Sequence, residues 1–592
     1  MRMDMDRMRL INIKAFLERE EVMSQGGRVD RRAKVLEFRD DETTAYAILS
    51  HRWIDPTEVD FEEMVFLAKV DSEERDEIRQ RLGYKKIMDS CEQAKKDGYK
   101  WLWVDTCCID RRSSAELSEA INSMYRWYEN SEVCYAYLHD VFGLSITNDN
   151  NRYPNSNGWP EWFSRGWTLQ EMIAPSNVRF FNNGWQEMGD KKSLARTLNA
   201  ITDVPEHILI HGFAFDRPCV AQIMSWAADR TTTQVEDRAY SVMGLLNVNM
   251  PMLYGEGKKA FHRLQLEIIR MSNDLSIFAW GCNTENRRTG SILADDPSFF
   301  RGCHDMELMD HEKFIRSFES YTFEGELYSI DKDRFGVFPI TNRGIQIWLF
   351  LRPYLNSRTV FQAWLPCCLG SVCEPVTIDL ALWDSDYYRY SSSVSLLRTD
   401  QDVELRQLHL KYQDAYHDIT FDINDSAIVD NGLTCCNVYP SKLAGNTLTL
   451  TGINPLCIRV YSDRQGNCHF AVAFGQCFGR DWIQVVPVPA SGFLWNEDFD
   501  EMLVRGPERA HSMALVPSRG DCYGHMWVKH THLRQTIWAV QISRVMRERS
   551  KIEVRMEIFQ RSDCSIGSNE CKFTDIEVGV LFTVHVQCHN HW

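Results

Sequence analysis

The amino-acid sequence predicts an α/β protein with three parts: a doubly wound N-terminal domain, a helical extension, and a β-rich antiparallel C-terminal region. From residue 45 to about 204, short apolar runs alternate with amphipathic stretches of helical length, which is typical of a parallel sheet with helices on both faces. After about residue 277, short β-type runs separated by Gly, Asn, Asp and Pro indicate antiparallel sheets in a sandwich or barrel. The expected segments are an N-terminal segment 1–44, the α/β domain 45–204, a helical extension 205–276 and the β-rich region 277–592.

Local signals justify each element of the predicted α/β domain in order. The expected strands are residues 45–50, 101–109, 133–140 and 178–182. The expected helices are residues 84–98, 113–130 and 163–174. The first helix ends on a glycine, and Ser113 or Ser114 is the expected N-cap of the second.

Two insertions interrupt this alternation. Residues 55–83 are strongly charged and predict a surface helix with its loops, whereas residues 144–160 are rich in Asn, Pro and Ser and predict a loop. The position of this loop before the helix 163–174 suggests a lid, with a solvated connection as the alternative.

Local sequence patterns also predict the helices of the extension and the strands of the C-terminal region. Helical spacing predicts helices within residues 193–204, 222–229, 235–246 and 255–272. The expected C-terminal strands are residues 326–330, 345–351, 359–365, 447–452, 457–462, 469–475, 536–543, 551–559 and 578–586.

Composition excludes several classes of function. The 592 residues include 66 Lys and Arg against 83 Asp and Glu, a net charge of −17 that argues against a nucleic-acid binder. No apolar run is long enough to cross a bilayer, and no signal peptide is apparent, so we expect no membrane insertion. Several of the 19 cysteines form adjacent pairs inside apolar runs, where reduced thiols pack as small hydrophobes. These features predict a cytoplasmic location.

Charged and aromatic residues follow the predicted strands at one edge of the sheet. Ligands of open doubly wound sheets bind beyond the carboxyl ends of the strands. The residues expected there are Ser50, His51, Arg52, Trp53, Asp105, Asp110, His139 and Asp140, with Arg165, Trp167, Gln170 and Glu171 from the helix 163–174. Alternatively, the aspartates cap helices, Arg165 pairs with one of them, and the tryptophans belong to the core.

Long motifs in this region resemble the fungal heterokaryon-incompatibility (HET) domain. The motifs are YAILSHRW, WLWVDTCCID, SAELSEAINSMYRWYENSEVCYAYLHDV and FSRGWTLQEMIAP. The later EDRAYSVMGLLNVNMPMLYGEGKKAFHRLQLEII resembles the segment that commonly follows this domain, so the resemblance covers residues 1–280. It implies a flavodoxin/TIR-like fold and a role in self/non-self recognition, in which fused, genetically unlike cells die.

The resemblance also implies an activity, because some TIR domains cleave NAD+ between nicotinamide and ribose. It places Glu171 at the position of their catalytic glutamate. Nicotinamide leaves as a neutral molecule, so no general acid is required, and one fixed carboxylate that holds the ribose hydroxyls and stabilises the oxocarbenium-like sugar promotes the reaction. The residues expected to bind substrate are His51, Arg52, Trp53, Asp105, Arg165 and Trp167, with cations on the pyrophosphate and Trp167 stacking on a ring. Alternatively, Glu171 is a helix-surface carboxylate paired with an arginine such as Arg165.

Weaker motifs do not support other chemistry. The sequence before Gly257 lacks the phosphate-loop spacing, because Met252 stands where a glycine is needed. Cys522, His525, His530 and His532, and likewise Cys303, His304 and His311, lack paired Cys-x2-Cys spacing, so we expect no metal site. A Ser50–His51–Asp105 hydrolase triad is disfavoured because adjacent side chains on a strand point to opposite faces.

Two functions stay open from the sequence. The first is a cell-death effector that hydrolyses NAD+ as its substrate, without a bound cofactor, and that is gated by self-association or by another incompatibility protein. The second is a non-enzymatic module that triggers death through contacts, since aromatic residues and arginine are also enriched at interfaces. The β-rich C-terminal region fits a carbohydrate- or protein-recognition module under either hypothesis.

Overall fold

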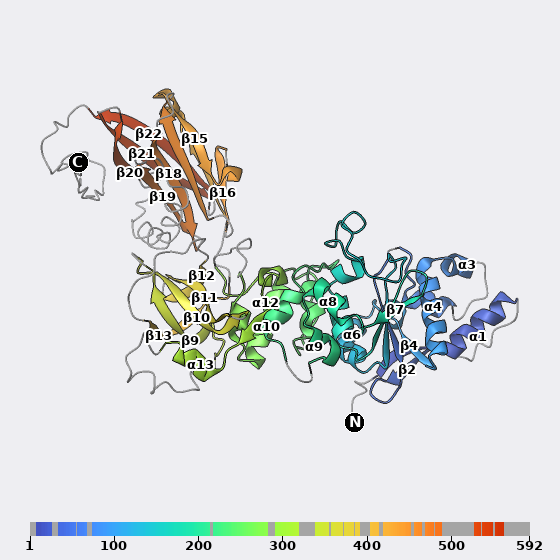
Figure 1. The fold of residues 1–592 in the computed structure, drawn as a ribbon. Coiled ribbons are helices and arrows are strands. Elements are labelled where there is room, and N and C mark those ends of the chain that lie inside the picture. The colour runs from blue at the N-terminus through green and yellow to red at the C-terminus, as the bar shows by residue number, and fades with distance from the viewer. Residues whose placement is uncertain are drawn as a thin grey trace. The chain divides into compact units, whose positions relative to one another are not determined.

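The computed structural model divides the chain into two compact units, Met1–Asp414 and Ala415–Trp592, which are described separately (Figure 1). The structure describes residues 7–25, 34–54, 56–67, 74–213, 217–281, 290–318, 338–354, 357–370, 372–383, 385–390, 403–413, 418–443, 445–451, 455–463, 468–478, 480–487, 526–533, 536–548 and 551–561. Among these residues, no helix combines the length and the apolar character needed to cross a bilayer.

A seven-stranded mixed sheet forms the centre of the N-terminal α/β region. Its strands, in spatial order, are β2 (Leu36–Asp40), β1 (Arg7–Asn12), β4 (Trp101–Trp103), β3 (Ala47–His51), β5 (Val133–Tyr137), β6 (Val178–Phe181) and β7 (Glu187–Asp190). The middle strands β4, β3, β5 and β6 are parallel, and their order matches the first four strands of a flavodoxin-like sheet. The outer strands β1, β2 and β7 pair antiparallel. The predicted N-terminal segment thus contributes two strands to this sheet.

Helices and helical turns of different lengths connect the strands of this sheet. They are α1 (Ile13–Ser24), α2 (Phe61–Leu67), α3 (Glu74–Arg79), α4 (Leu82–Lys96), α5 (Asp105–Cys108), α6 (Ser114–Glu129), η1 (Glu161–Ser164) and α7 (Thr168–Ile173). The Ser113 side chain caps α6 by accepting from the Glu116 N–H, which confirms one of the two predicted caps. In contrast, the prediction of one strand over 101–109 is wrong at its end, because residues from Asp105 form the helical turn α5.

The helical extension and a second sheet complete the first unit. The helices are α8 (Ala195–Thr202), α9 (Glu206–His211), α10 (Val220–Trp226), α11 (Asp237–Met243), α12 (Lys259–Met271), η2 (Leu275–Phe278), η3 (Pro297–Phe300) and α13 (His311–Arg316). The strands are β8 (Met306–Leu308), β9 (Ile345–Pro353), β10 (Val360–Leu369), β11 (Val372–Trp383), β12 (Asp386–Tyr390) and β13 (Glu404–Leu410). One continuous core runs from the strands of the first sheet through α8–α12 to β9, β10 and β13, so the helices are packed between the two sheets (Figure 1).

The second unit consists of two sheets around one core. The first contains β16 (Thr447–Leu450), β14 (Ile419–Asn424), β22 (Lys551–Arg561), β21 (Thr536–Glu548) and β20 (Met526–Leu533). The second contains β15 (Leu433–Tyr439), β17 (Leu456–Asp463), β18 (Cys468–Cys477) and β19 (Arg480–Pro487), with α16 (Ser426–Asp430) and η4 (Ser441–Leu443) between strands of the unit. Buried residues of both sheets, such as Phe421 and Phe474, share this core, in agreement with the predicted sandwich or barrel of sheets.

The β-rich region is therefore confirmed, with two parallel exceptions among its pairings, β12–β13 and β14–β22. The predicted strands 326–330 and 578–586 lie outside the described residues. The sequence boundaries after residues 44, 204 and 276 fall inside the first compact unit, and as domain boundaries they stay a prediction.

Candidate functional site

The carboxyl ends of three neighbouring parallel strands bring charged side chains together, as the sequence predicts. His51 ends β3 and Asp105 follows β4, and His51 Nε2 lies 3.7 Å from Asp105 Oδ1. The same nitrogen lies 3.7 Å from Glu58 Oε2. The His51 side chain is 1% exposed, and neither ring nitrogen makes a hydrogen bond. A buried imidazole thus lies between two carboxylates at the edge of the sheet.

A buried lysine, which sequence analysis did not single out, holds one of these carboxylates. Lys86 Nζ on α4 donates to both oxygens of Glu58, at 2.6 and 2.8 Å. Burial alone would raise the pKa of Glu58, but His51 and Lys86 together lower it to about 2. Burial lowers the pKa of Lys86. Glu58 belongs to the charged insertion 55–83. The composition of this insertion predicted a surface helix and did not indicate that one of its carboxylates contacts the buried His51 and Lys86.

Trp53 forms the exposed wall of the same site. Its indole Nε1 donates to Asp105 Oδ2 at 2.7 Å, and the Arg111 guanidinium lies 3.7 Å above its ring. Burial lowers the pKa of Arg111. Because Trp53 is 38% exposed, one aromatic surface is available at this rim next to a cation and a carboxylate. The alternative interpretation paired Arg165 with one of the aspartates. In the structure, Asp105 accepts a hydrogen bond from Trp53 instead.

Glu171 is buried beneath this rim rather than exposed on a helix surface. The residue is 5% exposed, and Ser50 Oγ donates to its Oε2 at 2.5 Å. Ser50 Oγ in turn accepts from Trp162 Nε1 at 2.9 Å, and Trp162 is fully buried. The alternative that Glu171 lies on a helix surface is therefore wrong, because its side chain is buried.

Burial also controls the charge of Glu171. Desolvation, with a smaller contribution from Asp105, raises the pKa of Glu171 to about 8, although Ser50, Tyr128 and Arg165 favour the charged form. At neutral pH the carboxyl is therefore mostly protonated in this conformation.

Arg230 anchors the chain segment that leads into α7. Its guanidinium donates to Arg165 O at 2.9 Å, to Thr168 Oγ1 at 3.0 Å and to Trp226 O at 3.2 Å. Arg230 is 4% exposed, and burial lowers its pKa to about 9 while the negative field of Glu171 raises it. No sequence motif marked this arginine, which lies in a polar stretch after α10.

The remaining residues predicted from the helix 163–174 are placed differently. α7 begins at Thr168, and Trp167 is its N-cap residue, whose carbonyl oxygen accepts from the Glu171 N–H at 3.4 Å. Trp167 favours the charged form of Asp237, and Asp237 accepts from the exposed Tyr254 hydroxyl at 3.0 Å. Arg165 donates to Thr233 Oγ1 at 3.3 Å, and burial lowers its pKa.

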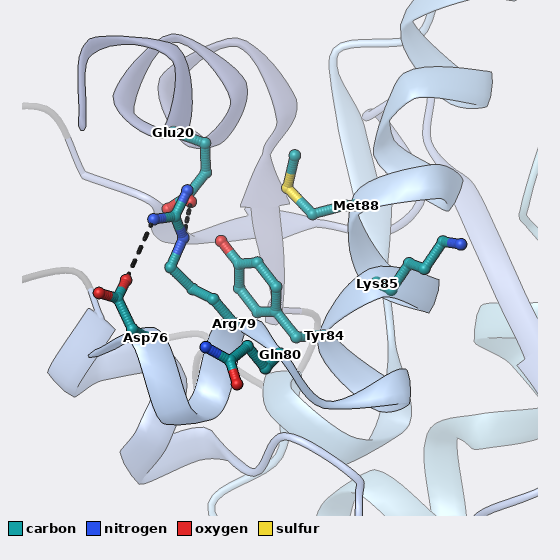
Figure 2. A pocket seen from close by; sticks show the side chains of 7 residues that line it. All are labelled: Glu20, Asp76, Arg79, Gln80, Tyr84, Lys85 and Met88. Carbon is teal, nitrogen blue, oxygen red and sulfur yellow. Dashed lines mark hydrogen bonds and ion pairs between the residues drawn. The ribbon is translucent and has the colours of Figure 1, made fainter. Parts of the chain in front are cut away.

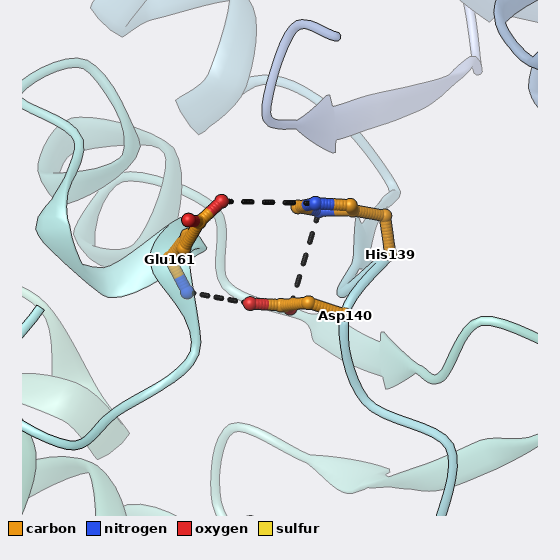
Figure 3. Close-up of side chains that lie close together, drawn as sticks. All are labelled: His139, Asp140 and Glu161. Atoms are coloured by element: carbon orange, nitrogen blue, oxygen red, sulfur yellow. Dashed lines mark hydrogen bonds and ion pairs between the residues drawn. The ribbon is translucent and has the colours of Figure 1, made fainter. Parts of the chain in front are cut away.

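Arg52 and the residues after β5 form the other end of the rim. Arg52 makes an ion pair with Glu161, whose Oε2 also lies 3.8 Å from His139 Nε2. Asp140 Oδ2 accepts from the Glu161 backbone N–H at 2.9 Å (Figure 3). Sequence analysis placed His139 and Asp140 at this rim but missed Glu161, which reaches it across the loop 144–160.

The loop 144–160 folds back on the chain that follows β5. It contains turns, and Tyr153 OH donates to Asp140 O at 3.1 Å. The assignment as a loop is confirmed, and its role as a lid stays a prediction.

A separate surface hollow of about 410 Å³ lies among α1, α3 and α4 (Figure 2). Arg79 is its central cation, and its Nε lies 2.9 Å from Glu20 Oε2 while its Nη1 lies 3.5 Å from Asp76 Oδ1. Because carboxylates of the chain occupy this guanidinium, the hollow is better explained by packing of charged helices than by an anion site.

Two of the weaker motifs, the glycine turn before α12 and the Ser50–His51 pair, behave as the sequence predicts. The N–H groups of Gly255 and Gly257 both donate to Glu236 Oε1, at 2.8 and 2.9 Å, so this turn binds a carboxylate of the chain rather than a phosphate. Ser50 donates to Glu171 and not to His51, which leaves no serine–histidine pair for a hydrolase triad. Cys522 and His525 lie outside the described residues.

The geometry defines an α/β domain with a charged rim, and part of this domain matches a known family. Residues 46–150 match the family described as Heterokaryon incompatibility protein (HET). The chain therefore contains a HET domain, as the sequence motifs indicated. Over 231 residues it is 42% identical to the vegetative incompatibility protein HET-E-1 of Podospora anserina. That match covers 38% of this chain and 16% of the relative, so the chain spans a small part of that protein's length.

Solved structures of a fungal lectin also align with part of the chain. The wild-type Xerocomus chrysenteron lectin XCL aligns over 24% of this chain and 99% of its own, with 12% identity and a TM-score of 0.18. A mutated form of the same lectin aligns over 24% of this chain and 97% of its own, with 13% identity and a TM-score of 0.17. These scores are too low to assign a fold to any part of the chain.

Proposed function

We propose that this chain is an effector of fungal self/non-self recognition that acts in the cytoplasm and kills the cell by hydrolysing NAD+ at the rim of its HET domain. The observation that carries this proposal is the convergence of cations, carboxylates and an exposed tryptophan at the carboxyl ends of β3, β4 and β5. Ligands of doubly wound sheets bind at this place.

The rim provides the groups that the reaction needs. Arg52 and Arg165 are suited to the pyrophosphate, because guanidinium groups bind phosphate oxygens with two parallel hydrogen bonds. Trp53 lies at the edge with 38% of its surface exposed and offers a face for a planar ring. A carboxylate next to the ribose would stabilise the positive charge that develops as neutral nicotinamide leaves. We assign this role to Glu171.

The burial of Glu171 implies that the described conformation is a resting state. A protonated carboxyl enclosed by Ser50 and Trp162 cannot stabilise a cation in bound substrate. Activation must therefore move Glu171 or its cover and lower its pKa. Self-association, or association with another incompatibility protein, would supply the free energy for this change. Such gating also protects the host cell from constant loss of NAD+.

The same burial favours a second candidate function. A glutamic acid with hydrogen-bonded neighbours inside a tryptophan-rich core is a structural group, and the rim would then be a contact surface. In this case the HET domain would transmit death through oligomerisation and would not be an enzyme.

Expression of the full chain in cells distinguishes the two functions. We expect induced wild-type protein to deplete NAD+ and kill the cells, and Glu171→Gln at matched level to do neither. Glu187→Gln, an exposed carboxylate on β7, is the control and should behave as wild type. Death with unchanged NAD+ would contradict the enzymatic proposal and support the contact mechanism.

A further inference from the structure

His139, Asp140 and Glu161 surround a common space at the end of β5 (Figure 3). Each residue offers one ligand atom, and these three atoms lie within 4.8 Å of one another. His139 Nδ1 lies 3.9 Å from Asp140 Oδ1, and both atoms are buried without a hydrogen-bond partner. The side chains are 19%, 16% and 33% exposed, so the cluster is partly enclosed but open to small ions.

A hydrogen bond within the cluster holds one of its carboxylates in place. Asp140 Oδ2 accepts from the Glu161 N–H, which fixes the aspartate and leaves its other oxygen facing the imidazole. Around a tetrahedral zinc ion with bonds of about 2.1 Å, neighbouring ligand atoms are about 3.4 Å apart. His139 can give the ion only one ring nitrogen, and this atom and one oxygen from each carboxylate lie within 4.8 Å of one another, so binding requires a contraction of up to about 1.4 Å.

We propose that His139, Asp140 and Glu161 bind a divalent first-row transition-metal ion, Mn²⁺ or Zn²⁺ in type. One imidazole nitrogen with two carboxylate oxygens is a donor set suited to these ions, and water would complete the coordination. A purely oxygen-binding ion such as Mg²⁺ is less suited, because it prefers carboxylates and phosphates to imidazole. The proposal departs from the sequence-based expectation of no metal site, which considered only the cysteine-containing clusters.

Arg52 competes with the ion for one of the ligands. Its guanidinium forms an ion pair with the same Glu161 oxygen that faces His139, and the Arg52 side chain is 32% exposed. Binding of the ion would release Arg52 toward solvent. Arg52 is a proposed substrate-binding residue. Metal binding would therefore make its guanidinium available to a phosphate group at the rim.

The site also connects the two ends of a loop. Asp140 precedes the chain segment 141–160, and Glu161 follows it. An ion bound by both residues would join the two ends of this loop through coordination bonds. This link would restrict the conformations of the segment between Asp140 and Glu161. Metal binding should therefore raise the thermal stability of the full chain.

Titration of the full chain, freed of metal by a chelator, tests the proposal. We expect one saturable site for Mn²⁺, followed by electron paramagnetic resonance, and for Zn²⁺, followed by calorimetry, with a rise in melting temperature. Asp140→Asn keeps the size of the side chain, and it should weaken binding by about tenfold or more. Arg52→Gln should tighten binding, because it frees Glu161.

Asp305→Asn is the matched control, since Asp305 lies 3.4 Å from His304 in an exposed pair without a further ligand. Its affinity for the ions should equal that of wild type. If Asp140→Asn does not fold, as judged by its melting curve without metal, Glu161→Gln takes its place. Absence of saturable binding, or equal binding in the ligand variant and the control, would overturn the proposal. This readout does not depend on NAD+ cleavage, so it stands apart from the proposed function.

Discussion

Replacing Arg230 with alanine is expected to lower the free energy of unfolding of the first unit by about 3–5 kcal/mol. The side chain is 4% exposed and donates to Arg165 O, Trp226 O and Thr168 Oγ1. Its removal leaves a cavity and deprives buried acceptors of a charged donor, both of which destabilise. Chemical denaturation followed by tryptophan fluorescence measures the change.

Arg301→Ala provides the control for this variant. Arg301 is paired with Asp229, the neighbour of Arg230, but the pair is largely exposed. Exposed ion pairs contribute at most about 1 kcal/mol, so this variant should be close to wild type. Equal stability of the two variants would contradict a structural role for Arg230.

Glu171 is expected to show a large difference between its alanine and glutamine variants. Glu171→Ala leaves the buried Ser50 hydroxyl without its acceptor and opens a cavity, which should destabilise the first unit by about 2–4 kcal/mol. Glu171→Gln has the size of the protonated acid and keeps an acceptor, so near pH 6 its stability should stay within about 1 kcal/mol of wild type. Denaturation of both variants at one pH checks this. A glutamine variant as unstable as the alanine variant would show that the carboxyl is ionised.

The raised pKa of Glu171 also predicts how stability changes with pH. The pKa is 4.5 when the group is unperturbed and about 8 in the folded chain, so between these values only the folded state holds the proton. The contribution of protonated Glu171 to the free energy of unfolding is therefore complete below pH 4.5. As the pH rises toward 8, this contribution decreases by up to about 1.4 kcal/mol per pH unit. The difference in unfolding free energy between wild type and Glu171→Gln, measured from pH 5 to 8, should follow this slope. A difference independent of pH would contradict the shift.

The strand ends of the parallel sheet were predictable because each strand is a short apolar run followed directly by polar residues. This pattern located Ser50, His51, Asp105 and His139 at one edge of the sheet. It did not reveal α5, because Cys107 and Cys108 are buried like the residues of a strand, and an apolar run does not distinguish a strand from one helical turn.

The charge state of the site was not predictable, because it depends on contacts between distant segments. Thr168 and Glu171 are three residues apart and predict a polar, solvent-facing side of α7, but all six residues of this helix are buried, so the sequence pattern did not give the direction of Glu171. Lys86 and Arg230 lie outside the motifs and reach the site only in the folded chain. Glu161 likewise reaches His139 through the path of a loop, which has no periodic pattern.

The release of nicotinamide from NAD+ by the purified full chain tests the central claim most directly. The chain would be fused to a domain that forms dimers when a small molecule is added, and wild type and Glu171→Gln would be compared with and without that molecule. We predict release by the dimerised wild type only, with none from Glu171→Gln. Equal release by the folded Glu171→Gln variant, or no release from the purified wild type after dimerisation, would contradict Glu171 as the catalytic carboxylate of an NAD+-cleaving HET domain.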